Sequence, residues 1–156
     1  MSRYLFDANV FLAATIEAHV HHIPAAQWVE SVELPSTLVF CRVTEMACLR
    51  LLTQSIAKGF QPLSNRDSAA VYLAWRQDER VQLFGEPSGL AELWPRLALR
   101  NDQSPKLWTD AYLASFAIAG GYCLVTFDRA YLQFEPQGLN LELLEPPPRQ
   151  SRNQRG

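Results

Sequence analysis

The sequence predicts an α/β fold in which a parallel sheet of four to five strands is flanked by helices on both faces. Short apolar runs alternate along the chain with stretches of helical periodicity, and this alternation implies crossover connections between parallel strands. The run at 122–126 is almost entirely apolar, which is typical of a parallel strand buried on both faces. The 156 residues, 48% of them hydrophobic, are enough for one domain with its own core.

The first forty residues contain two strand candidates separated by two helical stretches. Residues 3–6 form a short, largely apolar run and predict the first strand. Residues 10–16 predict one or two helical turns. A second helix is expected over 24–31, because its proline suits the first helical position, where no backbone N–H is needed. Residues 35–40 end in β-branched and aromatic side chains and predict the second strand.

The periodicity becomes helical from Arg42 onward, until Gly59 and Pro62 interrupt it. A second helix follows this break. Ser64 can cap its start, and Asp67 lies in its first turn, where an acid is favourable. The first helix has an inward stripe of Cys41, Glu45, Cys48, Leu49 and Leu52, and the second has one of Ala70, Val71, Ala74 and Trp75.

The next part of the chain predicts a strand, a helix and a loop. The apolar run 81–84 precedes a glycine and a proline and predicts a third strand. A helix over about 90–99 follows, in which Pro95 marks a kink or a boundary. Ser104 and Pro105 then form a cap and first-turn pair for the following helix.

The last part of the predicted domain contains two acids on either side of a glycine break. An apolar helix pattern carries Asp110 and ends at Gly120-Gly121, and the buried strand after it leads to Asp128. A fifth strand is expected over 139–144. The sequence thus predicts that the helix and the strand run in opposite directions and bring the two acids close together.

The composition and the two ends of the chain predict the domain bounds, the cellular location and the state of the cysteines. We assign residues 1–145 to one domain and residues 146–156, which are proline-led and basic, to a flexible tail. No apolar run approaches the roughly 18 residues of a membrane span, and the start lacks the pattern of a signal peptide, so a soluble, cytoplasmic protein is expected. The three cysteines form no metal-binding or disulfide pattern and are expected to be reduced and mostly buried. The net charge of -2 does not by itself indicate nucleic-acid binding.

Two acidic residues come directly after predicted strands. Asp7 follows the first strand, and Asp128 follows the fourth. Because ligands of an open parallel sheet gather at the carboxyl ends of its strands, both acids are expected at the same edge. The alternative is that each caps the helix after it, since aspartate is a favoured cap, and for either residue alone both interpretations stay open.

Two further acids, Glu45 and Asp110, are expected on inward faces near the starts of their helices. A buried carboxylate is costly unless a cation meets it, and the helix dipole offsets only part of that cost. A purely structural Glu45 would need a basic partner, for which Arg42 and Arg50 are the candidates. Four carboxylates around one cleft would repel one another, and their oxygens suit a hard divalent ion, Mg²⁺ or Mn²⁺.

Four short motifs resemble those of the PIN-domain nucleases, and among these most closely the VapC-type ribonuclease toxins of bacterial toxin–antitoxin pairs. They cover about residues 2–145 in order and spacing. Each motif alone is weak, whereas four in the right order on the right elements are specific. The motifs are Asp7-Ala-Asn9, Thr44-Glu45, Thr109-Asp110-Ala-Tyr-Leu and Val125-Thr126-Phe127-Asp128.

The resemblance implies a metal-dependent endoribonuclease that forms a homodimer and is blocked by a cognate antitoxin protein. By position in the motifs, the Mg²⁺ or Mn²⁺ ligands are Asp7, Glu45, Asp110 and Asp128, and the accessory polar residues are Asn9 and Thr126. Many relatives have a further acid shortly after the fourth, but Arg129, Ala130 and Tyr131 stand there in this chain, which leaves a second metal ion open.

The expected reaction is an in-line attack of metal-bound water on an RNA phosphodiester. Asp7 and Asp110 would hold the principal ion, and Glu45 and Asp128 would complete its shell, directly or through water. One of the latter two would accept the proton of the water. Asn9 and Thr126 would orient the carboxylates or the water.

Three other functions stay open. The chain can be a housekeeping PIN nuclease without an antitoxin, a phosphatase-like magnesium enzyme on a similar sheet, or a non-catalytic module. A dehalogenase-like phosphatase needs Asp-x-Asp after the first strand, but Asn9 fills the second position. A receiver domain needs a lysine after a late strand, which neither Lys58 nor Lys106 provides. Retention of four clustered acids argues against an inert module.

Histidines and tryptophans provide weaker signals. His19, His21 and His22 are most simply polar surface, with a metal site or an RNA or antitoxin contact as the alternatives. The four tryptophans are expected in the core or in a dimer interface, and base stacking by Trp94 or Trp108 is the alternative.

Overall fold

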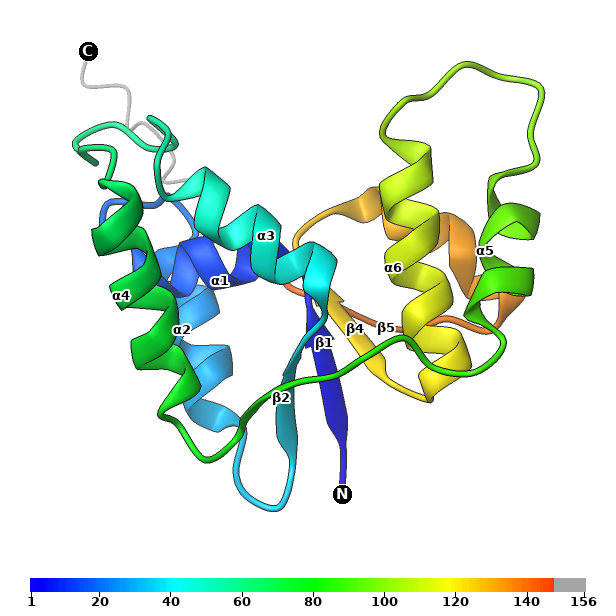
Figure 1. Ribbon diagram of the computed structural model, residues 1–156, viewed down its shortest axis with the longest axis horizontal. Coiled ribbons are helices and arrows are strands. Elements are labelled where there is room, and N and C mark those ends of the chain that lie inside the picture. Colours follow the sequence, from blue (N-terminus) through cyan, green and yellow to red (C-terminus); the bar gives the residue numbers. More distant parts are fainter. Residues whose placement is uncertain (148–156) are drawn as a thin grey trace, which may run out of the picture.

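The computed structural model describes residues 1–147 and contains five strands, six α-helices and one 3-10 helix (Figure 1). The predicted tail, residues 146–156, lies almost entirely outside the described residues. The strands are β1 Arg3–Phe6, β2 Thr37–Phe40, β3 Val81–Leu83, β4 Cys123–Thr126 and β5 Asn140–Leu143. The helices are α1 Ala8–Thr15, α2 His22–Ser31, α3 Arg42–Leu51, α4 Asn65–Arg76, α5 Leu90–Ala98, α6 Leu107–Gly120 and the 3-10 helix η1 Arg129–Gln137.

The five strands form one parallel sheet in the order β3-β2-β1-β4-β5, which confirms the predicted fold class. The central strand, β1, pairs with β2 on one side and β4 on the other, so that Phe6 lies opposite Val125. The backbone N–H of Asp7 continues this ladder and donates to the Val125 carbonyl at 2.9 Å. Asp7 therefore leaves the sheet beside Thr126, at the carboxyl edge that was predicted for it.

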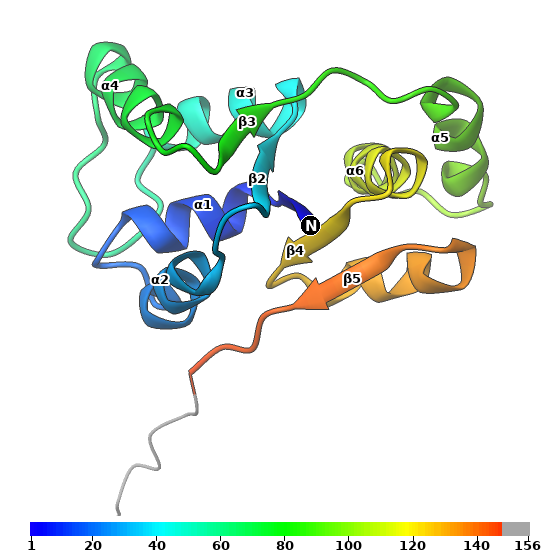
Figure 2. The same ribbon diagram turned by 90° about the horizontal axis from the view of Figure 1, so that it is seen from below.

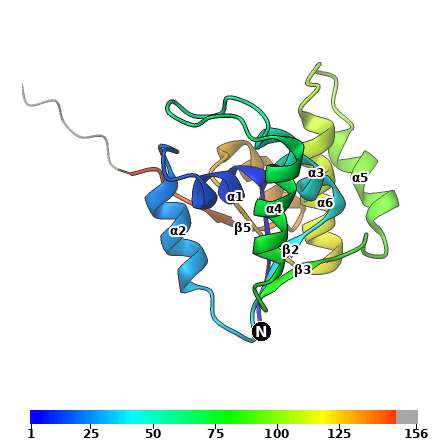
Figure 3. The same ribbon diagram turned by 60° about the vertical axis from the view of Figure 1, so that its left-hand side comes forward.

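Helices cover both faces of the sheet, because successive side chains of each strand point to opposite sides. On β1, Leu5 packs into a core formed with α5, α6 and η1, whereas Phe6 packs into one formed with α1, α2, α3 and α4. Figures 1 and 2 show these two groups of helices on opposite sides of the strands. In Figure 3, as in Figure 1, α5 and α6 lie alongside each other.

The predicted inward stripe of α4 is wrong in part. Tyr72 is buried and packs edge-to-face on Phe40, with ring centroids 5.1 Å apart, whereas Ala70 and Ala74 are exposed. Trp75 is half-buried, as expected for the stripe. The helix is rotated relative to the prediction because a tyrosine ring removes far more apolar area from water than two alanine methyl groups do.

The boundaries of α6 differ from the prediction at its start and agree at its end. Ser104 does not cap the helix with its side chain; its carbonyl accepts from the Leu107 N–H at 3.1 Å, one turn before the helix begins. At the other end, Gly121 adopts φ +67° and closes the helix, as the glycine pair predicts.

The Ser64 cap of α4 is confirmed by its bond from the Asp67 N–H at 3.1 Å.

Two further observations concern the cysteines and the helices of the part of the chain that the structure describes. Its three cysteines are free thiols, with Cys41 and Cys48 buried and Cys123 half-buried. None of its helices combines the length and the apolar character that crossing a membrane requires.

Candidate active site

The hydroxyl group of Thr126 organises the carboxyl edge of the sheet. Thr126 is fully buried at the end of β4. Its Oγ1 donates to Asp7 Oδ2 at 3.1 Å and accepts from Asn9 Nδ2 at 3.2 Å and from the Asp128 N–H at 3.0 Å. One donor and two acceptors are all that a hydroxyl offers, so this single atom sets the positions of three predicted site residues.

Asp110 joins this group through Lys106. The Lys106 Nζ donates to Asp110 Oδ2 at 2.9 Å and also forms an ion pair with Asp128. Lys106 precedes α6 by one residue and lies four residues before Asp110, so the two side chains meet on one face of the helix. Lys106 was not predicted as a site residue, although its position four residues before Asp110 is a signal that could have identified it.

A cleft of about 350 Å³ lies among these side chains. Asp7, Asp110 and Asp128 line it together with Lys106, and Tyr131 of η1 forms part of its wall. The other lining residues come from α1, α3 and α6 and are Ala8, Asn9, Leu12, Ala47, Leu51, Thr109 and Leu113. Three of the four predicted metal ligands therefore converge on one cavity.

The charges of the cleft are unevenly compensated. Burial raises the pKa of Asp7 to about 6, against the lowering effects of the Thr126 and Ala8 hydrogen bonds. Burial also acts on Asp128, but the bonds from Lys106 and from the Ala130 N–H outweigh it and lower its pKa. The single ammonium group thus pairs with Asp110 and Asp128, whereas the hydrogen bonds to the Asp7 carboxylate come from neutral donors.

Glu45 does not line this cleft. Its side chain is buried on α3, where it pairs with Arg42 and accepts a hydrogen bond from the Tyr72 hydroxyl of α4. Arg76 in turn donates to the Tyr72 hydroxyl at 3.1 Å. Arg42 was one of the two basic partners that a structural Glu45 would need, and Tyr72 was not anticipated.

The histidine loop touches the site from outside. The His21 ring stacks on Phe127, which lies between Thr126 and Asp128, with centroids 4.8 Å apart. His19 and His22 have other partners: the His19 ring accepts from the His21 N–H at 3.0 Å, and the His22 ring lies 2.8 Å from the Ala13 carbonyl. The three imidazoles do not converge on a common point, so a metal site here gains no support.

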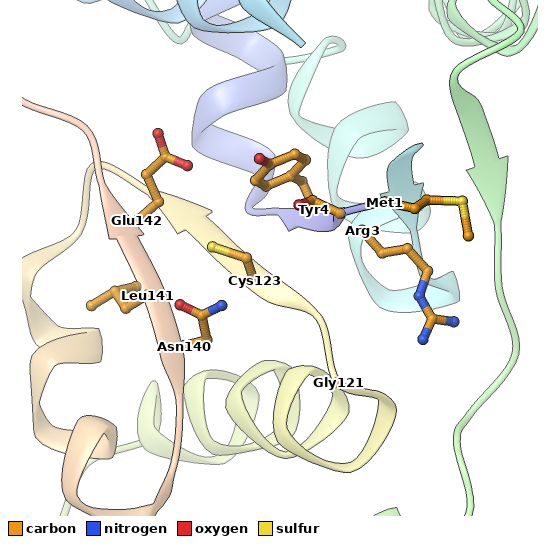
Figure 4. A pocket seen from close by; sticks show the side chains of 9 residues that line it. Met1, Arg3, Tyr4, Gly121, Cys123, Asn140, Leu141 and Glu142 are labelled. Atoms are coloured by element: carbon orange, nitrogen blue, oxygen red, sulfur yellow. The ribbon is translucent and has the colours of Figure 1, made fainter. Parts of the chain in front are cut away.

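A larger pocket, of about 470 Å³, lies at the opposite edge of the sheet (Figure 4). Glu142 is its acidic lining residue and accepts from Trp28 Nε1 at 3.0 Å. The guanidinium group of Arg3 points away from Glu142 and donates to the Gly120 carbonyl. This pocket lacks the convergent acids of the cleft, so it is not the candidate active site.

The donors of the cleft suit a divalent cation in chemical type. Asp7, Asp110 and Asp128 supply hard carboxylate oxygens, and a cation, the Lys106 ammonium, already lies between two of them. Within residues 1–147, however, no three acidic, histidine or cysteine side chains stand close enough together to enclose an ion as they are. Asp7, Asp110 and Asp128 are the residues that would hold such an ion.

The chain is similar to proteins of a known family. The model of the PIN domain matches residues 4–135. Ribonuclease VapC41 of Mycobacterium tuberculosis is 43% identical over 144 residues, which cover 90% of this chain and 97% of the relative. Two solved structures share the fold: M. tuberculosis VapC20, a toxin that cleaves the sarcin-ricin loop, and VapBC2 of Rickettsia felis bound to a promoter DNA fragment.

The two structures align with TM-scores of 0.63 and 0.60 at 15% and 18% identity. VapC20 is matched over 87% of this chain and 95% of its own, and VapBC2 over 92% and 99%. At such identities they support the fold alone, whereas the match of the family model and the 43% identity support the family. The chain belongs to the PIN-domain family, and within it to the VapC ribonucleases.

Proposed function

We propose that this protein is a metal-dependent endoribonuclease and the toxin of a bacterial type II toxin–antitoxin pair. The observation that carries this proposal is the convergence of Asp7, Asp110 and Asp128 on one cleft beside the buried Thr126 hydroxyl. The near full-length similarity to Ribonuclease VapC41 supports RNA as the substrate.

Each residue of the cleft has a role that its surroundings support. Asp7, Asp110 and Asp128 would hold Mg²⁺ or Mn²⁺, which when bound would supply Lewis acidity for the attacking water and the phosphate. Thr126 donates to the Asp7 carboxylate, and Asn9 donates to the Thr126 hydroxyl and so fixes that donor. The Asp128 side chain is 30% exposed and that of Asp110 only 9%, so Asp128 is the acid best able to exchange a proton with solvent.

Lys106 and Glu45 have distinct places in this proposal. Lys106 is the cation that the cleft itself provides, and once it leaves Asp110 its ammonium group can pair with a phosphate oxygen of the substrate. Glu45 stays a predicted fourth ligand. To reach the other three acids, its carboxylate has to exchange its bonds to Arg42 and Tyr72 for the ion.

Cleavage of RNA by purified protein tests the proposed activity. Wild-type protein is expected to produce internal cuts in end-labelled transfer, ribosomal or messenger RNA with Mg²⁺ or Mn²⁺, and none with a chelator. Asp110→Asn is expected to lower the rate at least about 100-fold, because a neutral amide cannot share in holding a divalent ion. Asp102→Asn, which alters an exposed acid paired with Arg100, is the matched control and keeps the wild-type rate. Wild-type cleavage by Asp110→Asn contradicts the assignment.

The toxin role has its own test. Expression of the chain in a bacterium is expected to arrest growth, and co-expression of the neighbouring small gene is expected to restore it and to co-purify its product. Cleavage of RNA without growth arrest or a co-purifying protein favours the housekeeping nuclease. Hydrolysis of a phosphate monoester without any RNA cleavage favours the phosphatase. A homodimer stays a prediction, which sedimentation of the purified protein tests.

A further inference from the structure

An aromatic pocket outside the acid cleft has no role in the proposed chemistry. It lies against α5 and the start of α6, has a volume of about 360 Å³, and is called the tryptophan pocket below. Trp94, Trp108 and Tyr112 supply its aromatic wall. Its remaining lining residues are Arg42, Val43, Glu86 and Thr109.

Two of the three rings are held rigidly, and the third presents a free surface. Trp94 Nε1 donates to the Trp108 carbonyl at 2.9 Å, and its ring meets that of Tyr112 edge-to-face at 5.5 Å. The Tyr112 hydroxyl donates to Glu86 at 2.9 Å. Trp108 packs its edge against Trp94 at 6.0 Å but is 50% exposed. The Trp108 ring is held by its contact with Trp94 and half exposed to solvent, so it is suited to stacking on a planar group such as a base.

The polar groups of the tryptophan pocket suit one strand of nucleic acid. The Arg42 side chain is 68% exposed at its rim, where a guanidinium group can pair with a phosphate. Glu86, the acid of the pocket, is already engaged by Tyr112 and can accept a further hydrogen bond from a base N–H. An aromatic platform with a cation beside it is the usual combination in sites for single-stranded RNA.

The tryptophan pocket adjoins the acid cleft. Thr109 lines both cavities, and it lies between Trp108 in one and Asp110 in the other. Arg42, at the pocket rim, is also the ion-pair partner of Glu45. A base that lies against Trp108 would therefore be close to the cleft that the three acids line.

Because the two cavities share Thr109, we propose that the tryptophan pocket binds one base of a single-stranded RNA substrate, next to the phosphate that is cleaved. The inference rests on the proposed ribonuclease function and adds a substrate-binding site to it. Trp108 provides the stacking surface, and Arg42 holds the adjoining phosphate. The protein would accordingly prefer loops and unpaired regions, because a paired base cannot reach the ring.

Binding of RNA in the absence of turnover tests this site. The probe is a fluorescein-labelled single-stranded RNA of about 12 nucleotides, titrated with the full-length protein in a chelator and followed by fluorescence anisotropy. Trp108→Ala is expected to weaken binding about tenfold, because it removes one base stack. Trp108→Phe keeps an aromatic face and is expected to stay within about threefold of wild type.

Leu73→Ala is the matched control, since Leu73 is 57% exposed on α4 and lies outside both cavities. It is expected to bind RNA like the wild type. A probe held in a duplex should bind more weakly to the wild type and should not distinguish Trp108→Ala from it. Circular dichroism verifies that each variant is folded.

Several outcomes overturn the inference. If the wild type cleaves RNA but Trp108→Ala binds the probe as tightly as the wild type does, the pocket does not hold a base and the proposed function survives. If Trp108→Ala instead turns a dimer into a monomer without weakening RNA binding per protomer, the face is covered by a second copy. If the wild type neither binds nor cleaves any RNA, the proposed function fails together with the inference.

Discussion

Asp7 combines an unfavourable buried charge with a proposed role in metal binding. Its carboxylate accepts from the buried Thr126 hydroxyl, and its closest cation is Lys106, which is bonded to other acids. Neutral hydrogen-bond donors do not offset the loss of hydration of a buried carboxylate. The charged form of the Asp7 carboxyl group is therefore disfavoured in the folded, metal-free protein.

The pH dependence of stability tests this view of Asp7. The folded-state pKa is raised to about 6 from 3.8, so the stability that this group contributes is fully present below pH 3.8 and is lost as the pH rises to about 6. Asp7→Asn removes that loss. Relative to wild type, the metal-free variant is expected to gain at most about 3 kcal/mol between pH 4 and pH 7.5.

Urea unfolding in a chelator at the two pH values measures this gain. Asp102→Asn, at an exposed position, serves as the control and should show no such difference. If the stability of Asp7→Asn relative to wild type is the same at both pH values, the carboxylate is not penalised in the folded protein.

The sequence predicted where the acidic residues of the site lie, but not all of their side-chain contacts. The acids were predictable because strand ends and helix starts determine where Cα atoms lie. The pair of Glu45 with Arg42 was among the predicted alternatives. Its contact with Tyr72 was not predictable, because it depends on a side chain of a helix 27 residues later. Lys106 was overlooked because a lysine in a loop is usually solvent-exposed, and only the bend between loop and helix directs it to both Asp110 and Asp128.

At the scale of elements, the path from α6 into β4 decides the geometry of the cleft. The helix brings Asp110 and the strand leads to Asp128, so the two glycines between them connect two halves of the site. Gly120 has no room for a side chain: a Cβ there would lie 2.2 Å from Cε2 of Tyr122. That ring cannot move aside freely, since it stacks on Phe116 and lies under the Arg3 guanidinium group.

Alanine substitutions distinguish the two glycines. Gly120→Ala is expected to destabilise the protein by about 2 to 3 kcal/mol through overpacking against Tyr122. Gly121→Ala meets open space but must keep φ +67°, and is expected to cost about 1 kcal/mol. Gly85→Ala, with open space and no positive φ, is the control and should change stability little. Unfolding in urea ranks the three, and an equal effect of Gly120→Ala and Gly85→Ala would contradict the packing argument.

The sequence predicted the strands and helices more accurately than it predicted which side of each helix is buried. All five strands and the six α-helices follow from apolar runs and helical periodicity, because burial on both faces of a parallel sheet leaves a strong pattern. The stripe of α4 was misjudged, since periodicity gives alanines the same weight as aromatic rings although Tyr72 buries more area. The 3-10 helix η1 was expected only as the short helix that Asp128 could cap, which its bond from the Ala130 N–H bears out. Its extent was not predicted, because Pro136 and the short turns lack the helical period.

For the whole molecule, the acid cleft joins parts of the fold that belong to different cores. Asp7 comes from the centre of the sheet, whereas Asp110 belongs to the α6 side of it. Repulsion among the acids therefore acts between the two halves of the molecule, and Lys106 forms direct ion pairs with Asp110 and Asp128. A cation bound by all three acids would hold the halves together, so metal binding and global stability are linked.

Thermal unfolding with and without Mn²⁺ tests this linkage. A ligand at about 100 times its Kd adds about 2.7 kcal/mol, which for a chain of this size corresponds to a rise in Tm of about 5–10 °C. Lys106→Met is expected to lower the Tm of the metal-free protein, because Asp110 and Asp128 lose their counter-charge. The same variant should show a larger rise with Mn²⁺ than the wild type does, because the ion no longer has to displace an ammonium group. Asp102→Asn should respond like the wild type, and a Tm of the wild type that is unchanged by Mn²⁺ would refute a metal site in the cleft.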